Sequence, residues 1–153
     1  MKFRMVIWLF VTALISTSQA IAGDLSLWAD KMSRSEYESK VANAKIDSYG
    51  FHYDIIDGIK TIFGPINATG LHLDNVRIVA YDTAAVYSDG GTTITNSTIE
   101  APVCIQSAGI NLHLDRDLLK CHLGVRFTTR YLINNSITNC SYSEQLSNKP
   151  DTF

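Results

Sequence analysis

The stretch "LHLD" occurs twice in this chain of 153 residues, at residues 71–74 and again at residues 112–115. Short runs in which apolar and polar residues alternate are typical of β-strands with one buried face. Midway between the two copies, "TIT" at residues 93–95 has the same alternation, so the pattern recurs about every twenty residues. A period of this length with no helix between the strands predicts a coil of short strands that winds back over itself.

Three sets of residues recur at this period. Two sets are apolar and predict stacked core columns, because successive turns of such a coil lie about 4.8 Å apart. The third set is polar and predicts a sharp corner, since Asn tolerates left-handed backbone geometry. The first apolar column is Leu73, Ile94, Leu114 and Ile133, the second is Ile78, Ile99, Leu119 and Ile137, and the corner column is Asn75, Asn96, Arg116 and Asn135.

Over residues 51–141 this pattern resembles the right-handed parallel β-helix of the pectate-lyase-like kind. The resemblance implies an all-β fold of about four turns, with a fifth suggested by a weaker match near Ile56. It does not imply one function, because β-helices include polysaccharide lyases, hydrolases, adhesins and phage spikes. The alternative fold is a small antiparallel β-sandwich, which also contains many short strands.

Residues 1–22 have the three-part pattern of a secretory signal peptide. Lys2 and Arg4 precede an apolar run at residues 5–15, and small residues lead to a cleavage site after Ala22. The apolar run is about half as long as a bilayer-spanning helix requires. We therefore expect a periplasmic or secreted bacterial protein, with no integral membrane span after the signal is cleaved.

Residues 23–50 predict a helical cap for the N-terminal end of the coil. Ser33 is suited to be the N-cap of a helix over residues 34–46, and Glu36 occupies the capping-box position. The polar residues 142–153 predict a flexible tail. Because this tail offers little cover for the C-terminal end, we expect self-association or partner docking there.

Charge and composition limit the classes of partner that are expected for this protein. Removal of Lys2 and Arg4 with the signal leaves eleven basic residues against fifteen acidic ones. A nucleic-acid-binding surface normally carries a basic stripe, so nucleic acid is not an expected partner. Nothing in the sequence indicates a cofactor, and no spacing matches a metal site of known type.

The outward residues of the two "LHLD" copies are the only constellation that suggests chemistry. His72, Asp74, His113 and Asp115 are predicted to lie on one face, as candidate ligand-binding residues. Imidazole and carboxylate groups together could act as acid and base, or bind a divalent ion. The sequence favours the simpler interpretation that they are solvated positions alternating with buried Leu, so no catalytic or metal-binding residue is assigned.

Three cysteines follow the signal segment, an odd number for an exported protein. Cys121 lies seven residues after Leu114, and Cys140 lies seven residues after Ile133. If the first column is correct, these two cysteines stack on adjacent turns. The alignment therefore predicts a Cys121–Cys140 disulfide and leaves Cys104 as a buried thiol.

The function expected from these features is that of an exported, non-catalytic structural or binding module for a glycan or a protein partner. The alternative is a carbohydrate-active enzyme, a polysaccharide lyase or hydrolase, that uses the outward His and Asp residues. The small number of turns favours the module, because a cleft that holds several sugars is normally built from more turns and longer loops.

Overall fold

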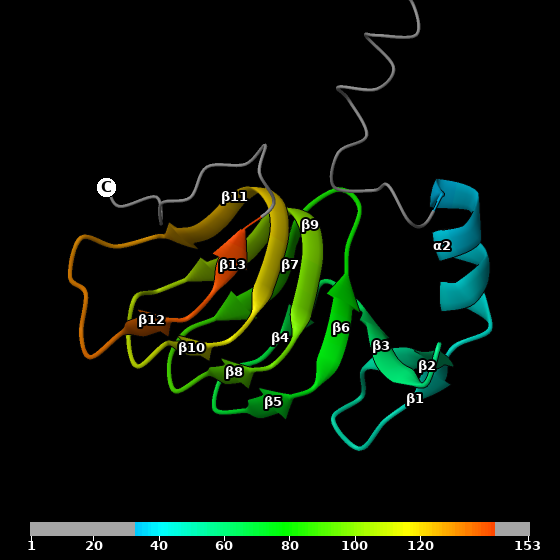
Figure 1. Ribbon diagram of the computed structural model, residues 1–153, viewed down its shortest axis with the longest axis horizontal. Coiled ribbons are helices and arrows are strands. Elements are labelled where there is room, and N and C mark those ends of the chain that lie inside the picture. The colour runs from blue at the N-terminus through cyan, green and yellow to red at the C-terminus, as the bar shows by residue number, and fades with distance from the viewer. Residues whose placement is uncertain (1–32, 143–153) are drawn as a thin grey trace, which may run out of the picture.

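The computed structural model describes residues 33–142, which form a parallel β-solenoid of about four turns with one short helix at its N-terminal side (Figure 1). The predicted all-β coil is thus confirmed. The predicted signal peptide lies outside the described residues, as do residues 143–153 of the predicted tail. Tyr142, which the sequence placed in that tail, belongs to the last strand.

The strands form three faces around one core. The first face consists of β3 (Ile59–Phe63), β6 (Val76–Val79), the beginning of β9 (Thr98–Ser107), the beginning of β11 (Leu118–Phe127), and β13 (Ser141–Tyr142). The second consists of β4 (Ile66–Asn67), β7 (Ala84–Ser88), and the ends of β9 and β11. The third consists of β5 (His72–Asp74), β8 (Thr93–Thr95), β10 (His113–Asp115) and β12 (Ser136–Thr138).

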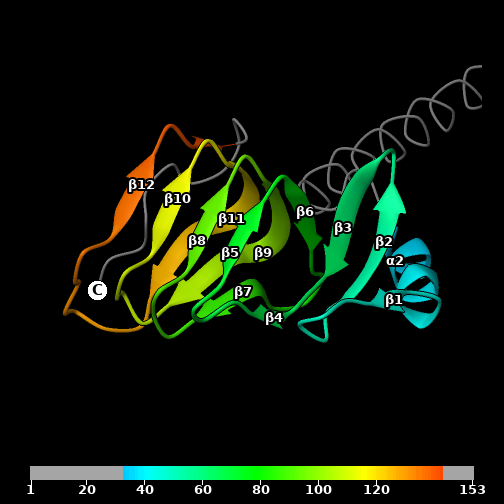
Figure 2. The ribbon, with the colours of Figure 1, turned by 90° about the horizontal axis from the view of Figure 1, so that it is seen from below.

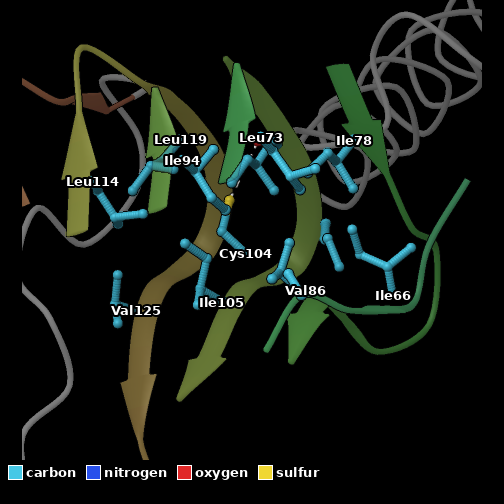
Figure 3. Packing of buried hydrophobic residues seen from close by; sticks show 14 of the residues in the cluster. Ile66, Leu73, Ile78, Val86, Ile94, Cys104, Ile105, Leu114, Leu119 and Val125 are labelled. Atoms are coloured by element: carbon cyan, nitrogen blue, oxygen red, sulfur yellow. Dashed lines mark hydrogen bonds between the residues drawn. The ribbon is translucent and has the colours of Figure 1, made fainter. Parts of the chain in front are cut away.

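The first three residues of each predicted aliphatic column form the core. Leu73 lies beside Ile94, and Ile94 lies beside Leu114, in parallel register on the third face. On the first face Ile78, Ile99 and Leu119 are paired in the same way. Figure 3 shows the labelled members of these columns meeting in the interior with Val86, Ile105 and Val125 of the second face, and Ile99 belongs to the same cluster.

The last turn is longer than predicted, which corrects the end of each column. Phe127 pairs with Ser107, twenty residues earlier, whereas Ile133 pairs with Ile110, twenty-three residues earlier. Three extra residues therefore lie between Phe127 and Ile133. As a result Ile137, not Ile133, stacks on Leu114, and Tyr142, not Ile137, pairs with Leu119.

The corner after the third face has the predicted left-handed backbone in every turn. The residues with positive φ are Asn75, Asn96, Arg116 and Asn139, with φ between 51° and 58°. The predicted Asn135 is replaced by Asn139, because the step from Arg116 is twenty-three residues and not the nineteen that the alignment assumed. Each of the first three corners donates its backbone N–H to a carbonyl oxygen of the next turn, at 3.1 Å in each case. The corners therefore stack as regularly as the core does.

An antiparallel hairpin, not a fifth turn, lies at the N-terminal end. Strand β2 (His52–Ile56) reverses into β3 through Asp57 and Gly58, whose φ angles of 52° and 78° suit a tight primed turn. Strand β1 (Lys45–Ile46) pairs with β2 and completes the edge. The weak match near Ile56 is therefore part of this hairpin, which extends the first face beyond β5 and β6 (Figure 2).

The helix α2 (Arg34–Ala42) begins where the sequence predicts it and ends earlier. The Ser33 hydroxyl accepts a hydrogen bond from the Glu36 N–H at 3.2 Å, as expected for an N-cap. The helix stops at Asn43 because Lys45 and Ile46 pair with β2 instead. None of its residues is buried, so the hairpin, rather than the helix, continues the sheet at this end.

Tyr37 packs α2 against the solenoid. The Tyr37 ring lies edge-on to Phe63, with ring centroids 5.7 Å apart, and 5.2 Å from the ring of Tyr81. Its hydroxyl donates to the Gly64 carbonyl oxygen at 2.7 Å. Arg34 Nη2 of the same helix lies 2.6 Å from Asp82 Oδ2, and Lys40 Nζ lies 3.8 Å from Asp54 Oδ2. The helix thus lies at the N-terminal side, as predicted, but contacts the outside of the solenoid without burying any of its residues.

Candidate functional site

The third face carries two rows of outward side chains, one from each end of its short strands. The first row is His72, Thr93, His113 and Ser136, and the second row is Asp74, Thr95, Asp115 and Thr138. The four candidate residues from the two "LHLD" copies therefore do share one face, in alternate turns. Because adjacent strands lie about 4.8 Å apart, like residues of the two copies are about 10 Å apart. In the longer last turn the members of these rows are Ser136 and Thr138, on either side of Ile137.

The two aspartates of this face hold adjacent turns together. Asp74 Oδ1 accepts hydrogen bonds from Thr95 Oγ1 at 2.6 Å and from Asn96 Nδ2 at 2.7 Å. Asp115 Oδ1 accepts the equivalent bonds from the Thr138 hydroxyl at 3.1 Å and from Asn139 Nδ2 at 2.8 Å. We call each set a turn staple. The repeated "LHLD" thus has a structural explanation, because each Asp joins its own turn to the corner of the next.

The staples also fix the charge of these carboxyl groups. Hydrogen bonds from Thr95 and then Asn96 hold the pKa of Asp74 below its usual value. The pKa of Asp115 is lowered chiefly by the Asn139 amide, and Arg116 Nε lies 2.9 Å from Asp115 Oδ2. Both groups are therefore ionised acceptors at neutral pH. A general acid needs a pKa nearer the working pH, so neither carboxyl group is suited to donate a proton.

The imidazole groups are more available than the carboxylates. His72 is exposed and His113 is half-buried. His72 Nε2 lies 3.4 Å from Thr95 Oγ1, whose proton is already donated to Asp74. The Thr95 oxygen can therefore accept from the His72 ring, which would orient that ring on the surface. The face thus offers two imidazoles among threonine and serine hydroxyls.

Asp117 is a residue of unusual chemistry that is not one of the four candidate residues. Its side chain is only 1% exposed, Oδ1 accepts from the Ser97 N–H at 2.8 Å, and Oδ2 has no partner. Burial raises the pKa of Asp117 to about 7. The only available signal was its place in "LDRD", directly after a corner residue. A pKa in this range is typical of catalytic carboxyl groups, but a group so deeply buried cannot reach a substrate.

Asp117 stands in a column where the neighbouring turn has a small hydroxyl group. In the preceding turn Ser97 Oγ accepts from the Val76 N–H at 3.2 Å and donates to the Thr95 carbonyl oxygen at 2.7 Å. In the following turn the Cys140 thiol donates to the Thr138 carbonyl oxygen at 3.4 Å. The side chains of this column form hydrogen bonds with backbone groups. A hydroxyl group is sufficient for that role, so the position does not require the carboxyl group of Asp117.

The disulfide differs from the predicted one. Cys104 and Cys121 are joined, with Cα atoms 5.6 Å apart, and Cys140 is a free thiol. Because Leu118 pairs with Ser141, Cys140 lies beside Asp117 and not beside Cys121. Cys121 pairs in register with Ala101, before the bend of β9, and Cys104 follows that bend. The bend turns both sulfur atoms into the core, where they lie 3.2 and 3.9 Å from the Ile99 carbonyl oxygen.

An ion-pair ladder crosses the first face. Glu100, which is 3% exposed, is contacted by Arg77 Nη2 at 2.8 Å and by Lys120 Nζ at 3.3 Å. The three residues lie on β6, β9 and β11, so the ladder connects three consecutive turns. Loss of the positive charge of Arg77 or of Lys120 would leave the buried Glu100 carboxylate with only part of its electrostatic compensation. We interpret this ladder as a structural feature, because the carboxylate is enclosed between its partners.

Within residues 33–142 there is no group of three or more His, Cys, Asp or Glu side chains placed to hold a metal ion. No helix in that range is long and apolar enough to cross a membrane. Comparison of the chain with protein-family models, with curated proteins and with solved structures found no match.

The turn staples lead to a prediction about acid stability. The folded pKa of Asp74 and of Asp115 is lowered, so their stabilising contribution is present above the unfolded pKa of about 3.9 and is lost as pH falls through the folded pKa. An Asp74→Asn/Asp115→Asn variant should lose stability at pH 7, and the difference from the wild type should shrink below pH 4. Urea unfolding between pH 2 and pH 7 would measure it. A constant difference at every pH would contradict this assignment.

Proposed function

We propose that the protein is a non-catalytic binding module that presents the third face of its solenoid to a glycan or a protein partner. The observation that carries this proposal is that both aspartates of the face are occupied by turn staples. A carboxylate that joins two turns cannot change its partners during a reaction without loosening the fold. The imidazole and hydroxyl groups of the face, in contrast, can bind a ligand without being displaced from the core.

The geometry of the face suits recognition of an extended ligand. Its strands are parallel and in register, so equivalent side chains repeat about every 4.8 Å along the solenoid axis. Hydroxyl and imidazole groups at regular spacing can bond to sugar hydroxyls or to polar side chains. In addition, β5 and β12 each have one partner strand among the described residues. An edge of this kind can accept an added strand from a protein.

The rival function is a polysaccharide lyase or hydrolase that uses the same His and Asp residues. One feature favours it, because burial raises the pKa of Asp117 to about 7. Burial of Asp117 argues against it. The spacing of Asp74 and Asp115, about 10 Å, also exceeds the roughly 5 to 9.5 Å between carboxyl groups in most glycosidases. The binding module is therefore the better supported function.

The two imidazoles provide the direct test. A His72→Ala/His113→Ala variant should bind at least about tenfold more weakly to any glycan or protein that the wild type retains, since each lost hydrogen bond contributes about 1 kcal/mol. Its melting temperature should change little, because neither ring lies in the core. A glycan array and a pull-down from the exported fraction would supply the ligands, and calorimetry would measure the affinity.

A matched control is available on another part of the surface. His122 is exposed on β11, so His122→Ala removes the same side chain away from the third face. This control should bind as the wild type does, and equal loss in both variants would exclude the third face as the binding site. The rival function would replace the module if the protein released reducing or unsaturated ends from a polysaccharide and the double variant abolished that turnover.

A further inference from the structure

The large exposed apolar side chains lie at the two ends of the solenoid. Four belong to β1, to the turn that follows it or to the hairpin β2–β3, and three belong to the last turn. They are Ile46, Tyr49, Ile55 and Ile59 at one end, and Tyr131, Leu132 and Ile133 at the other. Among the described residues the lateral faces carry none. Exposed apolar groups gathered in this way usually mark a contact surface.

At the C-terminal end these side chains come from the extra residues of the last turn. Tyr131 is 81% exposed and Ile133 is 54% exposed. Leu132 lies against Gly109, where a Cβ atom would be only 2.6 Å from its Cδ2. The backbone of Ile133 is paired with Ile110. Before Tyr131, the Thr128 N–H donates to the Ser107 carbonyl oxygen at 2.8 Å. The segment is therefore anchored on both sides of Tyr131, and it holds an aromatic ring and a branched aliphatic group outward.

The same end carries an open strand edge. Strand β12 pairs only with β10 among the described residues, and the Ser136 N–H donates inward to the Leu112 carbonyl oxygen at 2.8 Å. Backbone groups alternate in direction along a strand, so the N–H and C=O of Ile137 point away from β10. Within residues 33–142 no strand pairs with them, nor with the corresponding groups at the end of β11.

The last turn lacks the features that normally protect an edge. Residues 128–142 contain one charged side chain, Arg130, and no proline. Natural sheets usually blunt exposed edges with charges, proline or bulges, because a bare edge pairs with other chains. A nearly neutral surface of this kind can meet a copy of itself without like-charge repulsion. Charge thus favours a contact between identical ends.

The other end is not a suitable counterpart for this surface. There the hairpin β1–β3 extends the first face beyond β5 on the third face, so the end is stepped and not flat (Figure 2). Charged groups also surround it, including the ion pair between Lys60 Nζ and Asp47 Oδ2 at 2.6 Å. A head-to-tail stack would bring this step against the last turn. A contact between two C-terminal ends avoids the step altogether.

We propose that two copies of this chain associate through their C-terminal ends. The contact is symmetric about a two-fold axis, as most homodimer contacts are. Strand β12 of each copy runs antiparallel to β12 of the other, and Tyr131 and Ile133 of each copy pack against the second last turn. This dimer closes on itself, so it covers both open edges without forming a fibre.

Sedimentation velocity on the purified protein tests the proposal through one substitution. Tyr131→Lys removes an aromatic contact from each copy and places like charges across the axis. It should raise the dimer Kd by about tenfold or more. The matched control is Tyr49→Lys, which removes an exposed tyrosine from the opposite end. The control should leave the Kd unchanged.

Amide hydrogen exchange locates the contact. The Ile137 amide should exchange more slowly at high protein concentration in the wild type, and this concentration dependence should disappear in Tyr131→Lys. A wild type that stays monomeric at high concentration would overturn the proposal. So would a dimer that Tyr49→Lys disrupts and Tyr131→Lys does not, or a dimer in which Ile137 exchange is independent of concentration. None of these outcomes depends on whether the third face binds a ligand.

Discussion

Replacement of both Cys104 and Cys121 by Ala should lower the free energy of unfolding by about 3 kcal/mol. The disulfide closes a loop with a sequence separation of 17 residues, and a loop of this size removes about that much chain entropy from the unfolded state. It also ties the part of β9 after its bend to the next turn. Urea unfolding of the oxidised wild type and of the double variant would measure the difference.

Cys140 supplies the control for this experiment. Its thiol is half-buried and forms no disulfide, so Cys140→Ala should change the free energy of unfolding much less than the double substitution does. Non-reducing peptide mapping should recover the peptide of Cys104 linked to that of Cys121. A link between Cys121 and Cys140 would contradict the observed register of the last turn, because Cys140 would then have to leave its place beside Asp117.

Replacement of Asp117 by Ser should stabilise the protein at pH 8, on the order of 2 to 4 kcal/mol. The pKa of this carboxyl group is about 7 in the folded state against about 3.9 when unfolded, and each pKa unit corresponds to about 1.4 kcal/mol. Ser is the residue that performs the equivalent cap at position 97. The variant would keep a hydroxyl cap and remove the unpartnered Asp117 Oδ2.

The direction of the stability change in this variant follows from the pH dependence of the Asp117 carboxyl group. A folded-state pKa above the unfolded one means that the folded protein binds the proton more tightly. The Asp117 carboxyl group therefore does not lower the free energy of unfolding below about pH 4. The free energy of unfolding falls as pH rises from about 4 to 7. Asp117→Ser should remove that fall. Asp89→Ser, at an exposed position, should leave it in place. Equal stabilisation of both variants, or none at pH 8, would contradict the burial penalty assigned to Asp117.

The third face shows how far a sequence repeat can predict a site. The spacing of the two "LHLD" copies was enough to bring His72, Asp74, His113 and Asp115 to one surface, because alternation fixes which side chains point outward. It could not show that Asp74 and Asp115 accept hydrogen bonds from Thr95 and Thr138 of adjacent turns. Those bonds depend on the distance between turns. Because of these bonds, the two carboxylates are interpreted as structural links between turns and no longer as candidate ligand-binding groups.

The sequence by itself determined the coil, its period, and its first three turns, because alternation and left-handed corners are local properties that repeat wherever the residues do. Tertiary structure alone decided the register of the last turn, where three extra residues move Ile137 beneath Leu114. It also decided the disulfide, because the bend of β9 brings Cys104 to Cys121 from a different column. The physical reason is the same in both cases. Insertions and bends leave the local pattern of a strand unchanged, but they alter which residues meet across the core.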